Sequence, residues 1–172
     1  MSTIDSQVVF NFFALLVGGG LLGSLVLLRP NAARDQLREV LLDVAAIVAV
    51  CATAGSLYLS ESVGLVPCEL CWFQRIAMYP LAVILPLARA RNDRGVLPYA
   101  LALAVLGLFI SGYHVQLQLF PEQSSFCEVA NPCSNTLVQA FGTFSIPQLS
   151  MASFALLVIL MTAALRQSRK VI

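Results

Sequence analysis

The stretch VPCELCWFQRIAMYPLAVILPLARAR, residues 66–91, decides how the rest of the chain is arranged. It opens with a Cys-x-x-Cys pair, Cys68 and Cys71, and the apolar run that follows carries one charge, Arg75, before the final arginines. About 20 apolar residues in a helix reach across the roughly 30 Å hydrocarbon core of a bilayer. The stretch therefore predicts a membrane-spanning helix with a dithiol at one end and positive charge at the other.

The composition supports a membrane protein. Of the 172 residues, 59% are hydrophobic and 11% are charged, and the mean hydropathy is +0.85. A soluble domain typically has about 25% charged residues. The net charge of +1 and the lack of a basic patch interleaved with aromatic residues give no indication of a nucleic-acid partner.

Five segments are long and apolar enough to cross a bilayer. They are residues 8–28, 40–60, 71–88, 95–120 and 136–165. Gly142 and Pro147 interrupt the last one, and proline is well tolerated at the first position of a helix. We therefore expect the last span to begin near Pro147, with residues 134–146 as a short stretch lying on the surface.

The first of these segments has two possible interpretations. Residues 8–28 could be a cleaved signal peptide, but no basic residue precedes them and Arg29 follows directly. Those flanks favour an uncleaved anchor that starts outside. We expect an all-α integral membrane protein with a single domain over residues 1–172, built from a four-helix core at 40–165 and an additional N-terminal span.

The basic residues indicate the orientation of the spans. They fall in the first loop, the third loop and the C-terminal tail: Arg29, Arg34, Arg38, Arg89, Arg91, Arg94, Arg166, Arg169 and Lys170. Under the positive-inside rule these regions are cytoplasmic. The N-terminus and the loops around Pro67 and Asn131 are then expected outside, and the C-terminus inside.

Four of the five cysteines lie in or beside the two outside loops: Cys68, Cys71, Cys127 and Cys133. In an oxidising compartment such cysteines favour disulfide chemistry. Two structural disulfides would be the simplest interpretation. A Cys-x-x-Cys pair is a poor staple, however, because its short ring removes little chain entropy and tends to be reducible. Cys51, in mid-span, is expected to be a small core residue.

Two polar residues in the spans accompany the cysteines. Cys71 is expected in the first turn of a helix, where the helix dipole favours a thiolate. Arg75 lies four residues later on the same face, about 6 Å deeper. It either reaches back to the membrane surface or stabilises the thiolate and an anion beside it. His114, which we expect about 9 Å below the outer end of its span, is either a satisfied polar group or a donor that converges with Arg75 on a polar headgroup.

Electrons taken from thiols at the membrane surface need an acceptor. The sequence has no haem-attachment motif, no dinucleotide-binding glycine motif and no iron–sulfur cysteine run. A lipid-soluble quinone that enters from the bilayer is the acceptor left by elimination.

Three ordered motifs give the chain a family resemblance. PCELCWFQR, then YHVQLQLFPEQSSFC, then PCS followed by FGTFSIPQLS resemble the disulfide bond formation protein B (DsbB) family over roughly residues 40–165. The resemblance implies that Cys68 and Cys71 are a quinone-coupled pair and that Cys127 and Cys133 face a partner protein. It also implies that Arg75 and His114 bind the quinone, which would be ubiquinone or menaquinone.

The same resemblance implies a biological setting. The partner would be a DsbA-like, thioredoxin-fold thiol oxidase, and the protein would lie in the bacterial cytoplasmic (inner) membrane with its redox loops on the periplasmic or extracytoplasmic side. Two features depart from the best-known members. The span at 8–28 is additional, and only five residues separate Cys127 from Cys133, as in shorter-loop relatives.

Two other functions are compatible with the motifs. A quinone reductase of the vitamin K epoxide reductase type also uses four cysteines in a helical bundle, but there the Cys-x-x-Cys opens a late span. A membrane scaffold could instead use the four cysteines as a structural zinc site, because Cys-x-x-Cys is a common half-site.

Overall fold

The computed structural model describes residues 34–93, 95–121, 127, 133, 139–140 and 144–169. Within them lie four long helices, each apolar enough to cross a membrane: α2 (Arg34–Leu57), α3 (Glu69–Arg91), α4 (Leu97–Leu119) and α5 (Ile146–Arg169). The protein is therefore an all-α, multi-pass membrane protein, as the sequence predicts. The additional span expected at residues 8–28 lies outside the described residues.

The ends of the helices follow local sequence signals. A short π-helix, η1 (Tyr58–Ser62), continues α2 beyond the expected limit at residue 60. The last helix has Pro147 as its second residue, close to the expected start. Before it, strand β1 (Gln139–Ala140) pairs antiparallel with strand β2 (Phe144–Ser145). Phe144 is exposed but Ser145 is buried, so the stretch expected on the surface is partly built into the protein.

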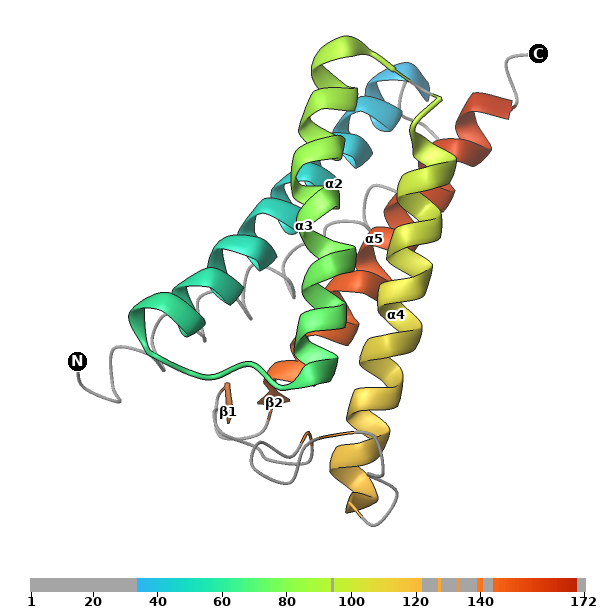
Figure 1. The fold of residues 1–172 in the computed structure, drawn as a ribbon. Coiled ribbons are helices and arrows are strands. Elements are labelled where there is room, and N and C mark those ends of the chain that lie inside the picture. The colour runs from blue at the N-terminus through green and yellow to red at the C-terminus, as the bar shows by residue number, and fades with distance from the viewer. Residues whose placement is uncertain are drawn as a thin grey trace.

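The four helices form a closed antiparallel bundle (Figure 1). Helix α2 packs against α3 and α5, and α4 packs against the same two neighbours from the other side. Consecutive helices run in opposite directions; the connection from α3 to α4 is short (residues 92–96), whereas the one from α4 to α5 is long (residues 120–145). The arrangement brings the start of α3 and the end of α4 to the same end of the bundle.

One face of α4 supplies its contacts with the rest of the bundle. The buried residues repeat at intervals of three and four: Leu97, Ala100, Ala104, Gly107, Ser111, His114 and Leu117. The small side chains in the middle of this face let another helix approach closely. The ring of Phe154, which is fully buried on α5, fills the space where Gly107 has no side chain.

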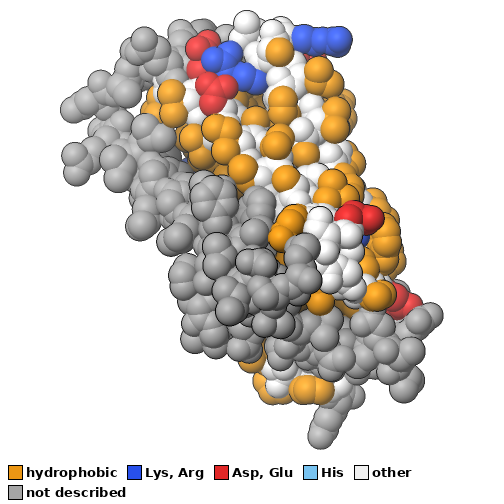
Figure 2. All heavy atoms as spheres, turned by 90° about the vertical axis from the view of Figure 1, so that its left-hand side faces the viewer, with side chains coloured by type: hydrophobic (Ala, Val, Ile, Leu, Met, Phe, Trp, Pro, Cys, Tyr) orange, Lys and Arg blue, Asp and Glu red, His pale blue; other side chains and the backbone are white. Residues whose placement is uncertain are grey.

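Charged residues gather at the end of the bundle away from Cys68. Arg89 of α3 donates to Asp43 at 2.8 Å and to Glu39 at 3.4 Å, which joins α3 to the first turns of α2. In Figure 2 most of the visible basic side chains lie at this end, hydrophobic side chains face the viewer below it, and some acidic side chains also lie toward the other end. Helix α3 ends there at Arg91, and the left-handed backbone of the next residue, Asn92, turns the chain so that the Asp93 N–H donates to the Ala88 carbonyl at 2.9 Å.

Replacement of Gly107 tests the close approach of α4 and α5. A methyl group at this position would meet the Phe154 ring, which is enclosed by other core residues, so Gly107→Ala should lower the free energy of unfolding by about 1–3 kcal/mol. Gly112→Ala is the matched control, because a methyl group at Gly112 meets no atom within 4 Å. The measurement is unfolding of each variant in detergent, and equal stability of Gly107→Ala and the native chain would contradict this packing.

Candidate active site

The Cys-x-x-Cys pair sits at the start of α3. Cys68 is the N-cap residue with extended backbone angles (φ −72°, ψ 172°), and Cys71 is in the first turn, where the sequence placed it. Both are free thiols, and their Sγ atoms are 3.0 Å apart. The pair is therefore a reduced dithiol in which one sulfur donates a hydrogen bond to the other.

The structure places the more acidic thiol at Cys68, whereas the sequence favoured Cys71. The hydrogen bond from the Cys71 side chain is the main cause that lowers the pKa of Cys68, and the His114 side chain lowers it further. Burial opposes this effect but does not cancel it. Cys71 is thus the proton donor of the pair, and Cys68 is the sulfur that is best prepared to carry negative charge.

His114 joins the dithiol to the outer loop. Its Nδ1 lies 3.1 Å from the amide nitrogen of Gln74, and its Nε2 lies 3.0 Å from the carbonyl oxygen of Cys133 and 3.7 Å from Cys68 Sγ. An amide nitrogen can only donate, so in this arrangement Nδ1 accepts and Nε2 carries the proton. The imidazole, which is buried, therefore donates to the Cys133 carbonyl beside the Cys68 sulfur.

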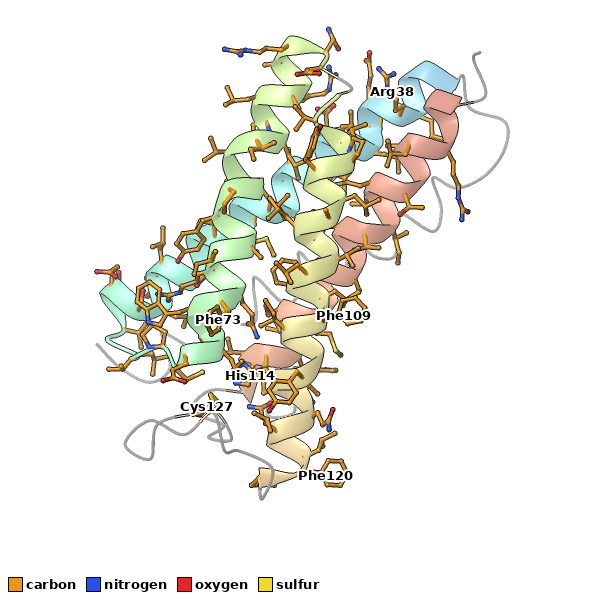
Figure 3. The ribbon with its side chains drawn as sticks, turned by 45° about the vertical axis from the view of Figure 1, so that its right-hand side comes forward. Arg38, Phe73, Phe109, His114, Phe120 and Cys127 are labelled. Atoms are coloured by element: carbon orange, nitrogen blue, oxygen red, sulfur yellow. A yellow bond between two sulfur atoms is a disulfide. The ribbon has the colours of Figure 1, made fainter. Side chains whose placement is uncertain are left out.

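The second cysteine pair lies directly beside the first. Cys127 and Cys133 form a disulfide; Cys133 is buried and Cys127 is half-buried. The sulfur atoms of Cys68 and Cys133 and a ring nitrogen of His114 all lie within 4.8 Å of one another. Figure 3 shows His114 on α4 close to the loop that carries Cys127. Thiol–disulfide exchange between the two pairs would need only a small movement of Cys68 or Cys133.

Arg75 faces α2 instead of the loop disulfide. Its Nε donates to Ser56 Oγ at 2.9 Å, and one terminal nitrogen donates to the Ser56 carbonyl at 3.0 Å. The guanidinium also lies 5.1 Å from the centre of the Trp72 ring. These contacts hold Arg75 between α2 and α3, one turn below Cys71. The hydrogen bonds of Arg75 and His114 go to different partners, and their expected convergence on one headgroup stays a prediction.

Two residues of the site were not identified from the sequence. Gln74 is buried and orients His114, and Ser56 anchors Arg75. The sequence contained a clue to Gln74, because an amide side chain three residues after Cys71 interrupts an otherwise apolar run. Ser56 had a weaker one, since serine is common in membrane helices.

The cysteines do not form the four-cysteine zinc site of a scaffold in this state. The Cys127–Cys133 disulfide removes two of the four thiolates that such a site needs. Cys51 is a half-buried free thiol, and its expected role as a small core residue stays a prediction.

Comparisons with known proteins find relatives of this chain. The family model described as "Disulfide bond formation protein DsbB" matches residues 38–164. "Disulfide bond formation protein C" of Bacillus subtilis is 43% identical over 126 residues, which cover 72% of this chain and 91% of that protein. "Probable disulfide formation protein C 2" of Bacillus anthracis is 40% identical over 126 residues, covering 73% of this chain and 90% of that protein.

"Probable disulfide formation protein" of Coxiella burnetii is 41% identical over 118 residues, covering 67% of this chain and 80% of that protein. No solved structure matches the chain significantly. The family match starts at residue 38, so it does not include the additional span expected at residues 8–28.

The assignment of the acidic thiol can be tested by alkylation. In the reduced protein Cys68 should react with iodoacetamide at a pH below the usual thiol pKa of about 8.5. Because the Cys71 hydrogen bond is the main cause of the lowered pKa, Cys71→Ala should move the reaction midpoint of Cys68 to higher pH. Mass spectrometry of labelled peptides across a pH series measures this, with Cys51→Ala as the control. Preferential labelling of Cys71 at low pH would contradict the assignment.

Proposed function

This chain belongs to the DsbB family of disulfide bond formation proteins, and from that premise we propose that it is a membrane thiol:quinone oxidoreductase. It reoxidises an extracytoplasmic DsbA-like dithiol oxidase and passes the electrons to a membrane quinone. The observation that carries the proposal is the contact between two cysteine pairs, one closed as a disulfide and the other reduced. A membrane anchor with a purely structural disulfide would have no need of a second, reduced pair beside it.

The first exchange opens the loop disulfide. A thiolate of the reduced partner attacks Cys127, which is the more accessible of the two sulfurs, and the S–S bond to Cys133 breaks. Cys133 leaves as a thiolate within reach of Cys68. It then attacks Cys68 in the oxidised Cys-x-x-Cys pair, and Cys71 is released as a thiolate. No electrons are lost in either step, because each exchange makes one S–S bond and breaks another.

The second exchange restores the loop disulfide. The partner's remaining thiol attacks its own sulfur in the mixed disulfide, so the oxidised partner departs and Cys127 is freed. Cys127 then attacks Cys133, and the bond from Cys133 to Cys68 breaks. Cys68 is a good leaving group because its thiolate is stabilised by Cys71 and His114. The product is a closed loop disulfide and a reduced Cys68–Cys71 pair, which is the state of the cysteines in this structure.

Arg75 and Cys71 fit a quinone headgroup at the start of α3. A bound quinone, ubiquinone or menaquinone, supplies the acceptor for two electrons and two protons as the Cys68–Cys71 disulfide re-forms. Arg75 lies on the Cys71 face of α3, one turn deeper, and a guanidinium held by Ser56 is suited to hydrogen-bond an oxygen that gains negative charge. His114 would stabilise the Cys68 thiolate. A DsbA-like partner at about −120 mV can be recharged only by a strong acceptor, which a quinone provides.

The proposed setting is the bacterial cytoplasmic membrane with the cysteine end of the bundle outside. The charged end, with Arg38, Arg89 and Arg166, would face the cytoplasm under the positive-inside rule. Family membership argues against a vitamin K epoxide reductase-like enzyme, since the chain matches the DsbB model over most of its length.

Removal of Cys133 tests the order of electron flow. In Cys133→Ala the free Cys127 should attack the disulfide of an oxidised DsbA-like partner and form a mixed disulfide that accumulates, because no loop thiol remains to resolve it and only the partner's own second thiol can reverse the reaction. Steady-state oxidation of the partner should fall to background, while quinone still oxidises Cys68 and Cys71. Non-reducing gels and mass mapping identify the bond, and Cys51→Ala should behave like the native chain. A complex that runs through Cys68 would overturn this order.

Replacement of Arg75 tests the quinone site. Arg75→Met should slow quinone reduction, by on the order of 10²-fold if the guanidinium acts as a preorganised donor to the developing charge. Arg75→Lys should lie between Arg75→Met and the native chain, because lysine keeps the charge but not the planar fork of donors. Thiol exchange with the partner, measured without quinone, should change little. Equal loss of both activities would mean that Arg75 supports packing, and unchanged turnover would remove it from the quinone site.

A further inference from the structure

The junction of the two cysteine pairs has the composition and spacing of a metal site. Cys68 Sγ, His114 Nε2 and Cys133 Sγ converge at the end of the bundle, and Cys71 Sγ lies 3.0 Å from Cys68 Sγ. With Zn–S bonds of about 2.3 Å and Zn–N bonds of about 2.0 Å, a tetrahedral site has ligand–ligand distances of roughly 3.6–3.8 Å. The distance from Cys68 to His114 is 3.7 Å. The Cys133 sulfur lies within 4.8 Å of both, and Cys71, which is next to Cys68, would have to move toward the other two ligands to complete the tetrahedron.

This site can exist in only one redox state of the protein. With the loop disulfide closed, Cys133 cannot act as a thiolate ligand. Reduction of that disulfide frees the Cys133 sulfur, whose residue is buried against Leu70 and Leu117 beside Cys68. When all four cysteines are reduced, the thiolates of Cys68 and Cys133 and the His114 imidazole can reach one ion, and Cys71, beside Cys68, can supply the fourth ligand.

We propose that the fully reduced protein binds one zinc ion through Cys68, Cys71, Cys133 and His114, and that the bound ion blocks electron transfer. Binding displaces three thiol protons and moves no electrons, since zinc is redox-inactive. Cys127 is left out of the site. The ion occupies three of the four sulfurs used in the relay, Cys127 being the exception, so it holds an enzyme without an electron acceptor in an inactive state. The blocking effect rests on the proposed relay, whereas the binding does not.

Gln74 would position the imidazole for the metal. A zinc-bound Nε2 must present its lone pair, so the proton moves to Nδ1. The Gln74 side chain, now 3.1 Å from Nδ1 through its nitrogen, can turn its amide oxygen toward that proton. A hydrogen bond of this kind to the far nitrogen is the usual support for a metal-bound histidine, and its loss typically weakens binding 10–100-fold.

Zinc binding by the purified full chain tests the proposal without quinone or partner. The protein is reduced with a phosphine under anaerobic conditions, and its zinc affinity is measured by competition with a chromophoric chelator. We expect one zinc per reduced chain and no tight site when the disulfides are formed. Cys127→Ala should retain the site, whereas His114→Ala and Cys133→Ala should bind at least about tenfold more weakly, and Gln74→Leu about 10–100-fold more weakly.

Matched variants distinguish this site from a zinc site built on the four cysteines of the two pairs, without His114. Cobalt(II) in place of zinc should give the absorption of a tetrahedral thiolate site in the native chain and in Cys127→Ala. Equal loss of binding in Cys127→Ala and Cys133→Ala would show a four-cysteine site and overturn the proposal, as would native affinity in His114→Ala or no stoichiometric zinc. Each variant must still form its remaining disulfide on oxidation, which checks its fold. A turnover assay separates the two proposals. If the proposed function is wrong, the protein will show no activity even without zinc. If only this inference is wrong, the protein will be active and added zinc will leave its activity unchanged.

Discussion

A bilayer core offers no water to satisfy backbone amides, so a chain that crosses it has to remain helical there. Irregular segments, and the chemistry that needs them, are confined to the ends of the helices. The structure follows this constraint: Cys68 lies one residue before α3, and the described part of the outer connection holds the Cys127–Cys133 disulfide. The first amides of a helix have no partner within it, which makes its start a favourable place for a thiolate.

The three- and four-residue spacing of the buried face of α4 also places His114 inside the bundle. The buried face that begins with Leu97 and Ala100 reaches His114 after further intervals of three and four residues. Bundle packing therefore aims the imidazole at the dithiol, and no special backbone feature of α4 is required. The imidazole then connects three parts of the molecule, since it contacts Gln74 on α3 and the Cys133 carbonyl in the loop.

The spans, the cysteine pairs and the start of α3 could be predicted from the sequence, because apolar length, spacing and Pro67 are local signals. The site's detailed chemistry could not. The hydrogen bond from Cys71 is the main cause that lowers the pKa of Cys68, but the further contribution comes from His114, 46 residues away from Cys68, and the role of Gln74 depends on the same ring, 40 residues away. Arg75 could be singled out from the sequence as a candidate functional residue, but its anchor Ser56 lies on another helix. The span at residues 8–28 stays a prediction.

The space beside Gly107 on α4, which we call the glycine notch, also fixes the rotation of that helix about its own axis. Gly107 and His114 are seven residues apart, which is close to two full turns and about 10.5 Å along the axis. Because the Phe154 ring fits into the notch, α4 can neither slide nor rotate against α5 without expelling the ring. The contact between Gly107 and Phe154 therefore sets the rotation of α4 that brings the imidazole to the dithiol. One residue inserted between Gly107 and His114 would rotate His114 by about 100° around the axis of α4 and move it out of the bundle, although both cysteine pairs would stay in place.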